Sequence, residues 1–166
     1  MYPLVSEKLR FISRELSQTI QFGTRLGELL GPGDVICLSG EMGAGKTALT
    51  SGIGKGWRAL EPVNSPTFVF VHPHRRAEDL VRLYHLDCYR LTSLEDALSI
   101  GIEDILSGRD VVVIEWPERI ASLLPPERLW VTLEALDDAD ARQLDLEAVG
   151  ERYISLLDAL AKTLTH

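Results

Sequence analysis

The stretch that decides the fold of this chain is Val35-Ile36-Cys37-Leu38-Ser39-Gly40-Glu41-Met42-Gly43-Ala44-Gly45-Lys46-Thr47. Residues 40–47 have the spacing of a P-loop, and the apolar run 35–38 before them predicts a buried strand. The glycines would let backbone N–H groups converge on phosphate oxygens, and a helix leaving the loop would add the positive end of its dipole. The stretch therefore predicts a strand, loop and helix that bind nucleotide phosphates.

Two side chains of the P-loop have specific expected roles. Lys46 would reach the β- and γ-phosphates, and the Thr47 hydroxyl would hold Mg²⁺. The alternative is a glycine-rich turn that binds nothing, and it is disfavoured because the full pattern stands between a predicted strand and a predicted helix. The predicted nucleotide contacts are Gly43, Ala44, Gly45, Lys46, Thr47 and Ala48.

Length and charge limit the possible architectures and partners. The 166 residues fit one domain, residues 1–166, with a single core. The net charge of −8 and the pI near 5.0 argue against a protein that binds nucleic acid directly. Such proteins usually carry a basic excess that neutralises phosphates. Any link to nucleic acid is therefore expected to run through a partner protein.

The sequence also predicts where the protein acts. No apolar run approaches the roughly 18 residues of a membrane span, and the first ten residues carry Glu7, Lys8 and Arg10 instead of an apolar signal core. We therefore expect a cytosolic protein that does not contact a membrane. Cys37 and Cys88 fit neither a disulfide framework nor a zinc site, so both are expected to be reduced thiols.

Hydrophobic patterns predict a sheet with parallel and antiparallel strands. Residues 67–72 and 80–86 are expected to form a hairpin around a polar turn, 73–79. The continuous apolar run 111–114 is typical of a strand covered on both faces. Two further strands are expected to form an antiparallel pair, 129–133 and 143–148.

Helices are predicted on both sides of the P-loop strand, in the middle of the chain and at its end. Ser17 can cap the first helix, and the glycines between 52 and 56 are expected to weaken the C-terminal half of the second. The third is expected to open with a capping box of Thr92 and Glu95 and to break near Gly101. The predicted helical ranges are 17–30, 47–60, 92–106 and 151 onward. The fold class is thus α/β, a single P-loop NTPase domain whose mixed central sheet is flanked by helices.

Hydrolysis of a nucleotide needs a carboxylate near the metal and the attacking water. Glu115 is the leading candidate, because it ends the run 111–114 and would project from the C-terminal end of a central strand, where open α/β sheets bind ligands. Asp87 follows the return strand of the hairpin, and its short carboxylate suits Mg²⁺. The alternative for Glu115 is an ordinary polar residue after a strand, and the alternative for Asp87 is a turn or capping residue. His85 by itself is expected to be a hydrogen-bonded structural imidazole.

Two more features could belong to the site. The segment 64–68 lies between the P-loop helix and the hairpin, where many P-loop proteins carry a switch that senses the γ-phosphate. Pro66 would hold it extended, and Ser65 and Thr67 offer hydroxyl groups, whereas the alternative is a loop that simply enters a strand. Trp116 would display its indole at the rim of the site, although core packing is the commoner fate of a single tryptophan.

Four motifs, in this order and in a chain of this length, together resemble the bacterial TsaE family. They are Gly-Glu-Met-Gly-Ala-Gly-Lys-Thr at 40–47, Asn-Ser-Pro-Thr-Phe at 64–68, His-Leu-Asp-Cys-Tyr-Arg-Leu at 85–91 and Ile-Glu-Trp-Pro-Glu at 114–118. The resemblance covers residues 17–150, approximately. The P-loop is generic, whereas the ordered set of the other three motifs is specific to the family.

The TsaE family is a small ATPase that is needed, with the TsaB and TsaD proteins, to form threonylcarbamoyl-adenosine beside the anticodon of certain tRNAs. The resemblance implies the same role here, with ATP and Mg²⁺ as cofactors and tRNA contacted only indirectly. It implies that Thr47 and Glu115 bind Mg²⁺ and that Asp87 supports the metal and the catalytic water. It further implies a switch at Ser65, Pro66, Thr67 and Phe68, a role in activity for Trp116, and contacts near the adenine and ribose from Thr19 and Arg142.

The expected activity is slow hydrolysis of Mg-ATP by the chain alone, with Lys46, Asp87 and Glu115 as the catalytic residues. Slow turnover is expected because no arginine stands out as a finger for the γ-phosphate. A nucleoside or small-metabolite kinase is a rival, although no arginine-rich lid segment is evident. A nucleotide-gated binding module whose hydrolysis is incidental is a third interpretation.

Overall fold

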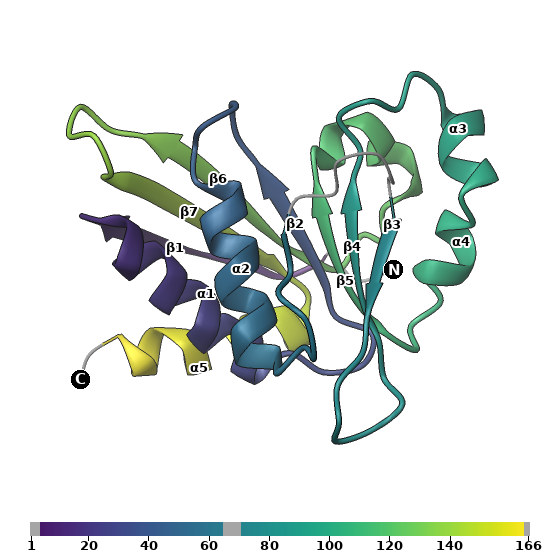
Figure 1. Ribbon diagram of the computed structural model, residues 1–166, viewed down its shortest axis with the longest axis horizontal. Coiled ribbons are helices and arrows are strands. Elements are labelled where there is room, and N and C mark those ends of the chain that lie inside the picture. Colours follow the sequence, from purple (N-terminus) through teal and green to yellow (C-terminus); the bar gives the residue numbers. More distant parts are fainter. Residues whose placement is uncertain (1–3, 65–70, 165–166) are drawn as a thin grey trace.

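Seven strands form one sheet in the computed structural model, which describes residues 4–64 and 71–164 (Figure 1). The strands are β1 (Ser6–Ser13), β2 (Val35–Ser39), β3 (Val71–His74), β4 (Leu83–Asp87), β5 (Val111–Glu115), β6 (Arg128–Ala135) and β7 (Arg142–Val149). The helices are α1 (Leu16–Leu29), α2 (Lys46–Trp57), α3 (Leu94–Ser99), α4 (Ile102–Ile105), the 3-10 helix η1 (Pro117–Leu123) and α5 (Glu151–Thr163).

The sheet is mixed, as predicted, with the order β1-β7-β6-β2-β5-β4-β3. The P-loop strand β2 is parallel to both β5 and β6, and β4 is parallel to β5. The remaining pairs, β1 with β7, β6 with β7 and β3 with β4, are antiparallel. The carboxyl ends of β2, β4 and β5 therefore meet at one edge of the sheet, where open α/β sheets bind ligands.

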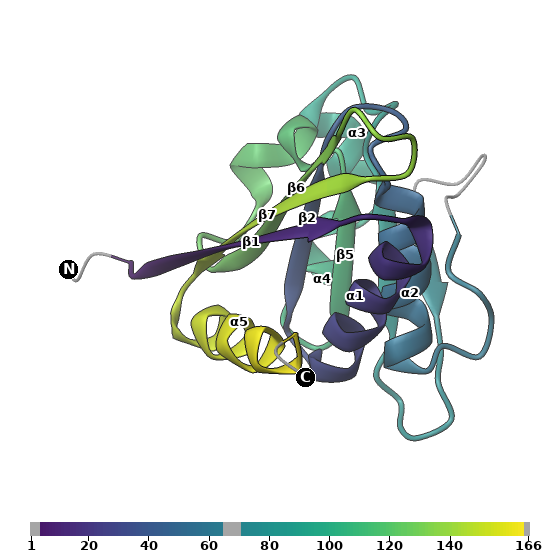
Figure 2. The same ribbon diagram turned by 90° about the vertical axis from the view of Figure 1, so that its left-hand side faces the viewer.

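Helices cover both faces of the sheet. Successive residues of β2 point to opposite faces, so Ile36 joins a core with α1, α2 and α5, whereas Cys37 joins a second core with α3, α4 and η1. Figure 2 shows β1, β7 and β6 side by side, with α5 and α1 on one side of them. Within the described ranges, no helix has the length and apolar character that a membrane span requires. Cys37 and Cys88 are both buried free thiols.

The contact between α1 and α2 depends on glycine. A Cβ atom on Gly56 would lie 1.9 Å from the Thr24 carbonyl oxygen, and one on Gly27 would lie 2.2 Å from that of Ile53. These are impossible separations, so the two helices pack at a distance that only glycine permits. The glycines that were expected to weaken the end of α2 thus make this contact, and the helix ends at Trp57, a buried core residue, and not at the predicted residue 60.

The turn of the hairpin lies later in the chain than predicted. β3 includes Pro73, which is tolerated because β3 is the edge strand of the sheet. The turn starts after His74, and its residue Leu80, predicted to be in a strand, is 97% exposed. Asp79 stabilises this turn by accepting hydrogen bonds from the Arg76 guanidinium and the Val81 N–H group. Residues 67–70 of the predicted strand lie outside the described residues.

Two helix starts also differ from the prediction. The N-cap of α1 is Glu15, not Ser17, and the Ser17 hydroxyl instead donates to the Glu15 carboxylate. The cap of α3 is Ser93, whose hydroxyl accepts from the Asp96 N–H group, because Asp96 is the residue three positions later. The predicted helix break is confirmed at Gly101, which has a φ of +79° and separates α3 from α4.

The strand β1 was not predicted at all. It pairs with β7 over its whole length, from Ser6 opposite Val149 to Ser13 opposite Arg142. Leu9 and Phe11 pack on the core, whereas Lys8 and Arg10 form cross-strand ion pairs with carboxylates of β7. The charged residues of this segment therefore belong to the outer face of a strand.

Candidate nucleotide site

The P-loop joins β2 to α2, as predicted. Gly45 is the N-cap of α2 and has a φ of +104°, a left-handed conformation that favours glycine. Gly40 has a φ of +148°, and a Cβ atom there would lie 2.5 Å from the Leu133 carbonyl oxygen on β6. The sequence thus supplies glycine where the backbone turns sharply. The N-terminal N–H groups of α2 form an anion-binding end of the helix.

A pocket of about 580 Å³ lies at this end of α2. It is built from the start of α1, the P-loop, the first turns of α2, and the ends of β4 and β5. Its lining residues are Leu16, Ile20, Met42, Gly43, Gly45, Lys46, Thr47, Ala48, Ser51, Asn64, Asp87, Tyr89, Glu115 and Trp116. The volume is within the range of small-molecule and cofactor sites.

The Lys46 side chain extends across the P-loop. Its ammonium group donates a hydrogen bond to the Gly40 carbonyl oxygen and lies 3.8 Å from the centre of the Trp116 ring. Burial lowers the pKa of Lys46, while nearby carboxylates, Glu115 and Asp87 foremost, act in the opposite direction. The pocket thus holds a cation beside two acidic side chains.

The two acidic candidates lie on neighbouring strands at the same level. Asp87 is the register partner of Glu115 in the parallel pair of β4 and β5. Glu115 is 4% exposed, whereas Asp87 is partly exposed and accepts a hydrogen bond of 3.0 Å from the Tyr89 N–H group. Asp87 therefore stabilises the turn after β4, as its alternative interpretation predicted, and it also lines the pocket.

His85 is hydrogen-bonded at both ring nitrogens, as expected of a structural imidazole. Its Nδ1 atom lies 3.1 Å from the Asn64 carbonyl oxygen, and its Nε2 atom lies 2.6 Å from Oε2 of Glu115. The side chain is completely buried. One of its two partners is therefore the candidate catalytic carboxylate, a relationship that the sequence alone did not predict.

Trp116 lies at the rim of the pocket. Its φ of +57° is unusual for a residue other than glycine, and it is the N-cap of η1. The Tyr89 ring lies 5.0 Å away between centroids, and the Lys46 ammonium lies against the indole. Trp116 is only partly buried, so it both packs on the neighbouring core and contacts the P-loop lysine.

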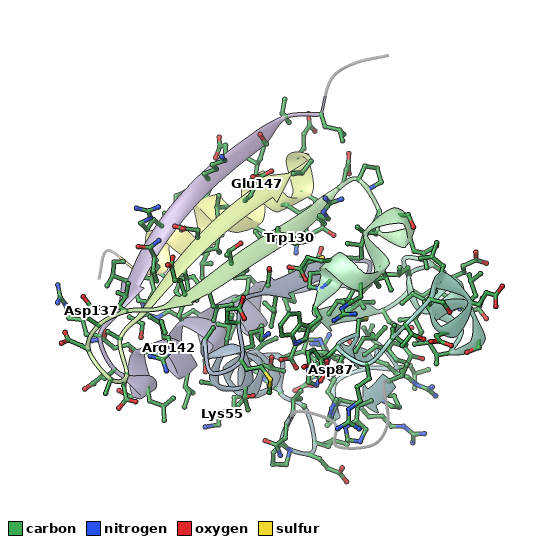
Figure 3. All side chains as sticks on the ribbon, turned by 90° about the horizontal axis from the view of Figure 1, so that it is seen from above. Lys55, Asp87, Trp130, Asp137, Arg142 and Glu147 are labelled. Atoms are coloured by element: carbon green, nitrogen blue, oxygen red, sulfur yellow. The ribbon has the colours of Figure 1, made fainter. Side chains whose placement is uncertain are left out.

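Three predicted nucleotide contacts, Thr19, Ala44 and Arg142, do not line this pocket. Thr19 is 1% exposed, and its hydroxyl shares a hydrogen bond of 2.7 Å with Ser13. Arg142 packs its aliphatic stem close to Gly45, and its Nη1 atom donates to backbone carbonyls of the β6–β7 turn. Seen from above, Arg142 comes from the side of β7 and Asp87 from the side of β4, with α2 between them (Figure 3).

Some of the remaining predicted site residues line the pocket, and others do not or lie outside the described residues. Ala44 is buried beneath the loop and does not line the pocket. The predicted switch residues Ser65, Pro66, Thr67 and Phe68 lie outside the described residues. The predicted residues that line the pocket together are Gly43, Gly45, Lys46, Thr47, Ala48, Asp87, Glu115 and Trp116.

Several lining residues were not predicted to belong to the site. Leu16 and Ile20 are four positions apart on α1, so they share a face, and this spacing was a usable signal. Tyr89 follows Asp87 by two positions, yet only the turn after β4 brings its ring to Trp116. Ser51 was not predicted either, whereas Met42 belongs to the predicted P-loop and Asn64 to the predicted switch segment, and all three line the pocket.

The site offers oxygen ligands that suit Mg²⁺. In residues 4–64 and 71–164, no group of three or more His, Cys, Asp or Glu side chains is arranged to hold a metal by itself. The pocket does bring together the Thr47 hydroxyl with the carboxylates of Asp87 and Glu115. Mg²⁺ is usually held by one or two carboxylates together with substrate phosphates and water, so the residues fit this ion as part of a nucleotide complex.

Comparison with known proteins places this geometry in a family. The model of the family described as threonylcarbamoyl adenosine biosynthesis protein TsaE matches residues 13–144. The chain belongs to the TsaE family. The match includes the P-loop and all the residues that line the pocket, and it confirms the resemblance drawn from the four motifs.

Relatives and a solved structure support this membership. A protein of Treponema pallidum named tRNA threonylcarbamoyladenosine biosynthesis protein TsaE is 39% identical over 132 residues, which are 80% of this chain and 96% of the relative. The Bacillus subtilis protein of the same name is 36% identical over 131 residues, or 79% of this chain and 80% of the relative. A crystal structure of Bacillus subtilis YdiB covers 96% of this chain and 97% of its own, with a TM-score of 0.78 and 27% identity. The TsaE-family fold thus extends over nearly the whole chain.

Proposed function

We propose that this TsaE-family protein is a Mg²⁺-dependent ATPase that acts in the biosynthesis of threonylcarbamoyladenosine in tRNA. The observation that carries the proposal is the pocket that joins Lys46 and Thr47 of the P-loop with Asp87 and Glu115. These are the types of group that phosphoryl transfer to water requires: a phosphate cradle, metal ligands and a carboxylate near the reacting atoms. The relatives are named as tRNA threonylcarbamoyladenosine biosynthesis proteins, which supports the proposed role in that biosynthesis.

Each part of the pocket has a role in this proposal. The N–H groups at the start of α2 and the Lys46 ammonium bind the phosphates. Thr47, Asp87 and Glu115 hold Mg²⁺, and the bound ion would neutralise charge that develops on the phosphate oxygens. Glu115, whose Oε2 atom is hydrogen-bonded to His85, would use its Oε1 atom for the metal or for the attacking water.

The apolar part of the pocket supports binding of a nucleoside. Leu16 and Ile20 of α1 and Met42 of the P-loop line the pocket, and Met42 is 74% exposed. Apolar side chains of this kind suit a planar base. Of the two positions that the resemblance assigns to the adenine and ribose, Arg142 packs near the lining residue Gly45.

Turnover by the chain alone is proposed to be slow. Among the described residues, no arginine lines the pocket, and an arginine supplied by a partner can accelerate phosphoryl transfer by about 10³ to 10⁵. We propose that TsaB and TsaD are the partners that complete the site. With a net charge of −8, the chain would reach tRNA through those partners in the cytosol and not by itself.

The test is phosphate release from Mg-ATP by the wild-type protein and by Glu115→Ala, each with and without TsaB and TsaD. The proposal predicts slow release by the wild type, stimulation by the partners, and loss of release in a Glu115→Ala protein that is still folded. Wild-type rates in Glu115→Ala would remove this carboxylate from the mechanism. Transfer of phosphate to a nucleoside or metabolite would instead favour a kinase, and full activity of Glu115→Gln in cells would favour a binding module.

A further inference from the structure

The buried imidazole of His85 lies directly behind the pocket. His85 is in the middle of β4, two residues before Asp87, and it is the register partner of Val113 on β5. Its Nε2 atom lies 2.6 Å from Oε2 of Glu115, and its Nδ1 atom lies 3.1 Å from the carbonyl oxygen of Asn64. Asn64 and Glu115 line the pocket, whereas His85 does not. The imidazole thus connects two lining residues, Asn64 and Glu115, without lining the pocket itself.

The chemistry of the two partners fixes the orientation of the ring. The Asn64 carbonyl oxygen can only accept, so Nδ1 carries a hydrogen and donates it. Nε2 and Oε2 of Glu115 share a second hydrogen, so the ring has a partner at each nitrogen. A flipped ring would place carbon atoms opposite both oxygens and would leave two buried polar groups unsatisfied. The imidazole is therefore held in one orientation, and it holds the carboxylate in turn.

We infer that His85 is a positioning residue for Glu115 and that it also ties this carboxylate to the backbone at Asn64. The hydrogen bond occupies Oε2 at the back of the pocket, which leaves Oε1 for a metal or a water. Without it, the carboxylate is free to turn toward the Lys46 ammonium, on which it already acts electrostatically. The effect on turnover rests on the proposed ATPase function, whereas the contact itself does not.

Two conservative substitutions separate the two hydrogen bonds. The amide nitrogen of a glutamine can occupy the position of Nε2, whereas that of an asparagine reaches only the position of Nδ1. His85→Gln is expected to keep the contact with Glu115 and a kcat close to the wild type. His85→Asn is expected to lose that contact and to lower kcat by about 10- to 100-fold, with the KM for ATP and the Kd for Mg-ATP near their wild-type values.

His74→Asn is the matched control, because His74 is also buried and lies on the neighbouring strand β3. Its Nε2 atom has no hydrogen-bond partner among the described residues. The same substitution there is expected to leave kcat unchanged. Equal loss of kcat in His74→Asn and His85→Asn, or wild-type kcat in a folded His85→Asn protein, would overturn the inference.

Imidazole ¹H–¹⁵N NMR spectra of the full chain test the contact between His85 and Glu115 independently of any ATPase measurement. The signals of His85 are assigned as those absent from His85→Gln. In Glu115→Gln, the Nε2 resonance of His85 is expected to shift strongly, while the resonances of His74 stay in place. Unchanged His85 signals would overturn the inference. A shifted Nε2 signal in a protein that hydrolyses no ATP, with or without partners, would support the contact and contradict the proposed ATPase function instead.

Discussion

The ammonium nitrogen of Lys46 lies 3.8 Å from the centre of the Trp116 ring. A cation over an indole face is attracted by the electron-rich ring, and the attraction grows when water is excluded, as it is for a lysine that is 6% exposed. Trp116 follows Glu115, so the contact joins the P-loop to the strand that carries the candidate catalytic acid. A nucleotide phosphate would compete with the indole for the same ammonium group.

This competition predicts a fluorescence signal. Addition of Mg-ATP should change the tryptophan emission of the wild-type protein, because the ammonium moves from the Trp116 ring toward phosphate oxygens. Trp116→Phe should lose the change, although Trp57 and Trp130 remain. The measurement is a fluorescence titration beside calorimetry on the same samples. Bound nucleotide without any emission change in the wild type would contradict the prediction.

The close packing of α1 on α2 predicts a large effect of a small substitution. In Gly56→Ala, the added methyl group would meet the Thr24 carbonyl oxygen at 1.9 Å, so the helices must separate. Overpacking of this kind costs about 1 to 3 kcal/mol or more, which exceeds the gain of about 1 kcal/mol in helix propensity. Urea unfolding should show lower stability for Gly56→Ala and little change for Lys55→Ala, the exposed neighbour. Equal stability of the two variants would mean that the helices do not pack through Gly56.

The Tyr153 hydroxyl attaches α5 to the start of the P-loop strand. It accepts a hydrogen bond of 2.8 Å from the buried N–H group of Val35. Tyr153→Phe would leave that donor unsatisfied and should lower the free energy of unfolding by about 1 to 3 kcal/mol. Tyr89→Phe should change stability less, because Tyr89 is 42% exposed. The prediction fails if chemical denaturation shows no difference between Tyr153→Phe and the wild type.

The two cysteines predict a dependence on alkaline pH. Burial raises the pKa of both Cys37 and Cys88 from 9.0 to about 12. Between these values the thiols ionise in the unfolded chain but not in the native protein, so the unfolded state binds fewer protons and stability falls as pH rises above about 9. Below pH 9 the thiols should contribute no pH dependence.

Two measurements check the cysteine prediction. The native protein should react very slowly with a thiol reagent at pH 8, whereas the unfolded chain should expose both thiols at once. Urea unfolding at pH 8 and pH 10 should show a smaller loss of stability in the Cys37→Ala, Cys88→Ala double variant than in the wild type. Rapid reaction of the native thiols would show that they are not buried as described.

The parts of the fold that were predicted correctly depend on local patterns. The P-loop and the strand β5 are each predicted from a few adjacent residues. The spacing of the glycines indicates the loop, and an uninterrupted apolar run indicates a strand buried on both faces. The placement of Glu115 at the end of β5 follows from that run. For the same reason the antiparallel pair of β6 and β7 was found from alternation alone.

The missed parts depend on contacts between distant segments. β1 has charged residues whose partners are on β7, as in the pair of Arg10 and Asp145, so its own sequence gives a weak signal. The bond between His85 and Glu115 follows from the parallel register of β4 and β5, which brings together residues that are 30 positions apart. The glycines of α2 predict a weak end of the helix from propensity alone, whereas Gly56 permits the close contact with α1. In each case the structure depends on contacts between elements that are distant in the sequence, which local patterns do not reveal.

The most direct test of the account is the affinity of the protein for Mg-ATP, measured by calorimetry for the wild type, Lys46→Ala and Lys55→Ala. Lys55 is the matched control, because it is on the same helix but exposed near its far end. Loss of a charged hydrogen-bond donor to phosphate costs about 1.5 to 3 kcal/mol, so Lys46→Ala should bind about 10- to 150-fold more weakly, and Lys55→Ala should bind like the wild type. Equal affinities for the wild type and Lys46→Ala, or no binding of Mg-ATP by the wild type, would contradict the account.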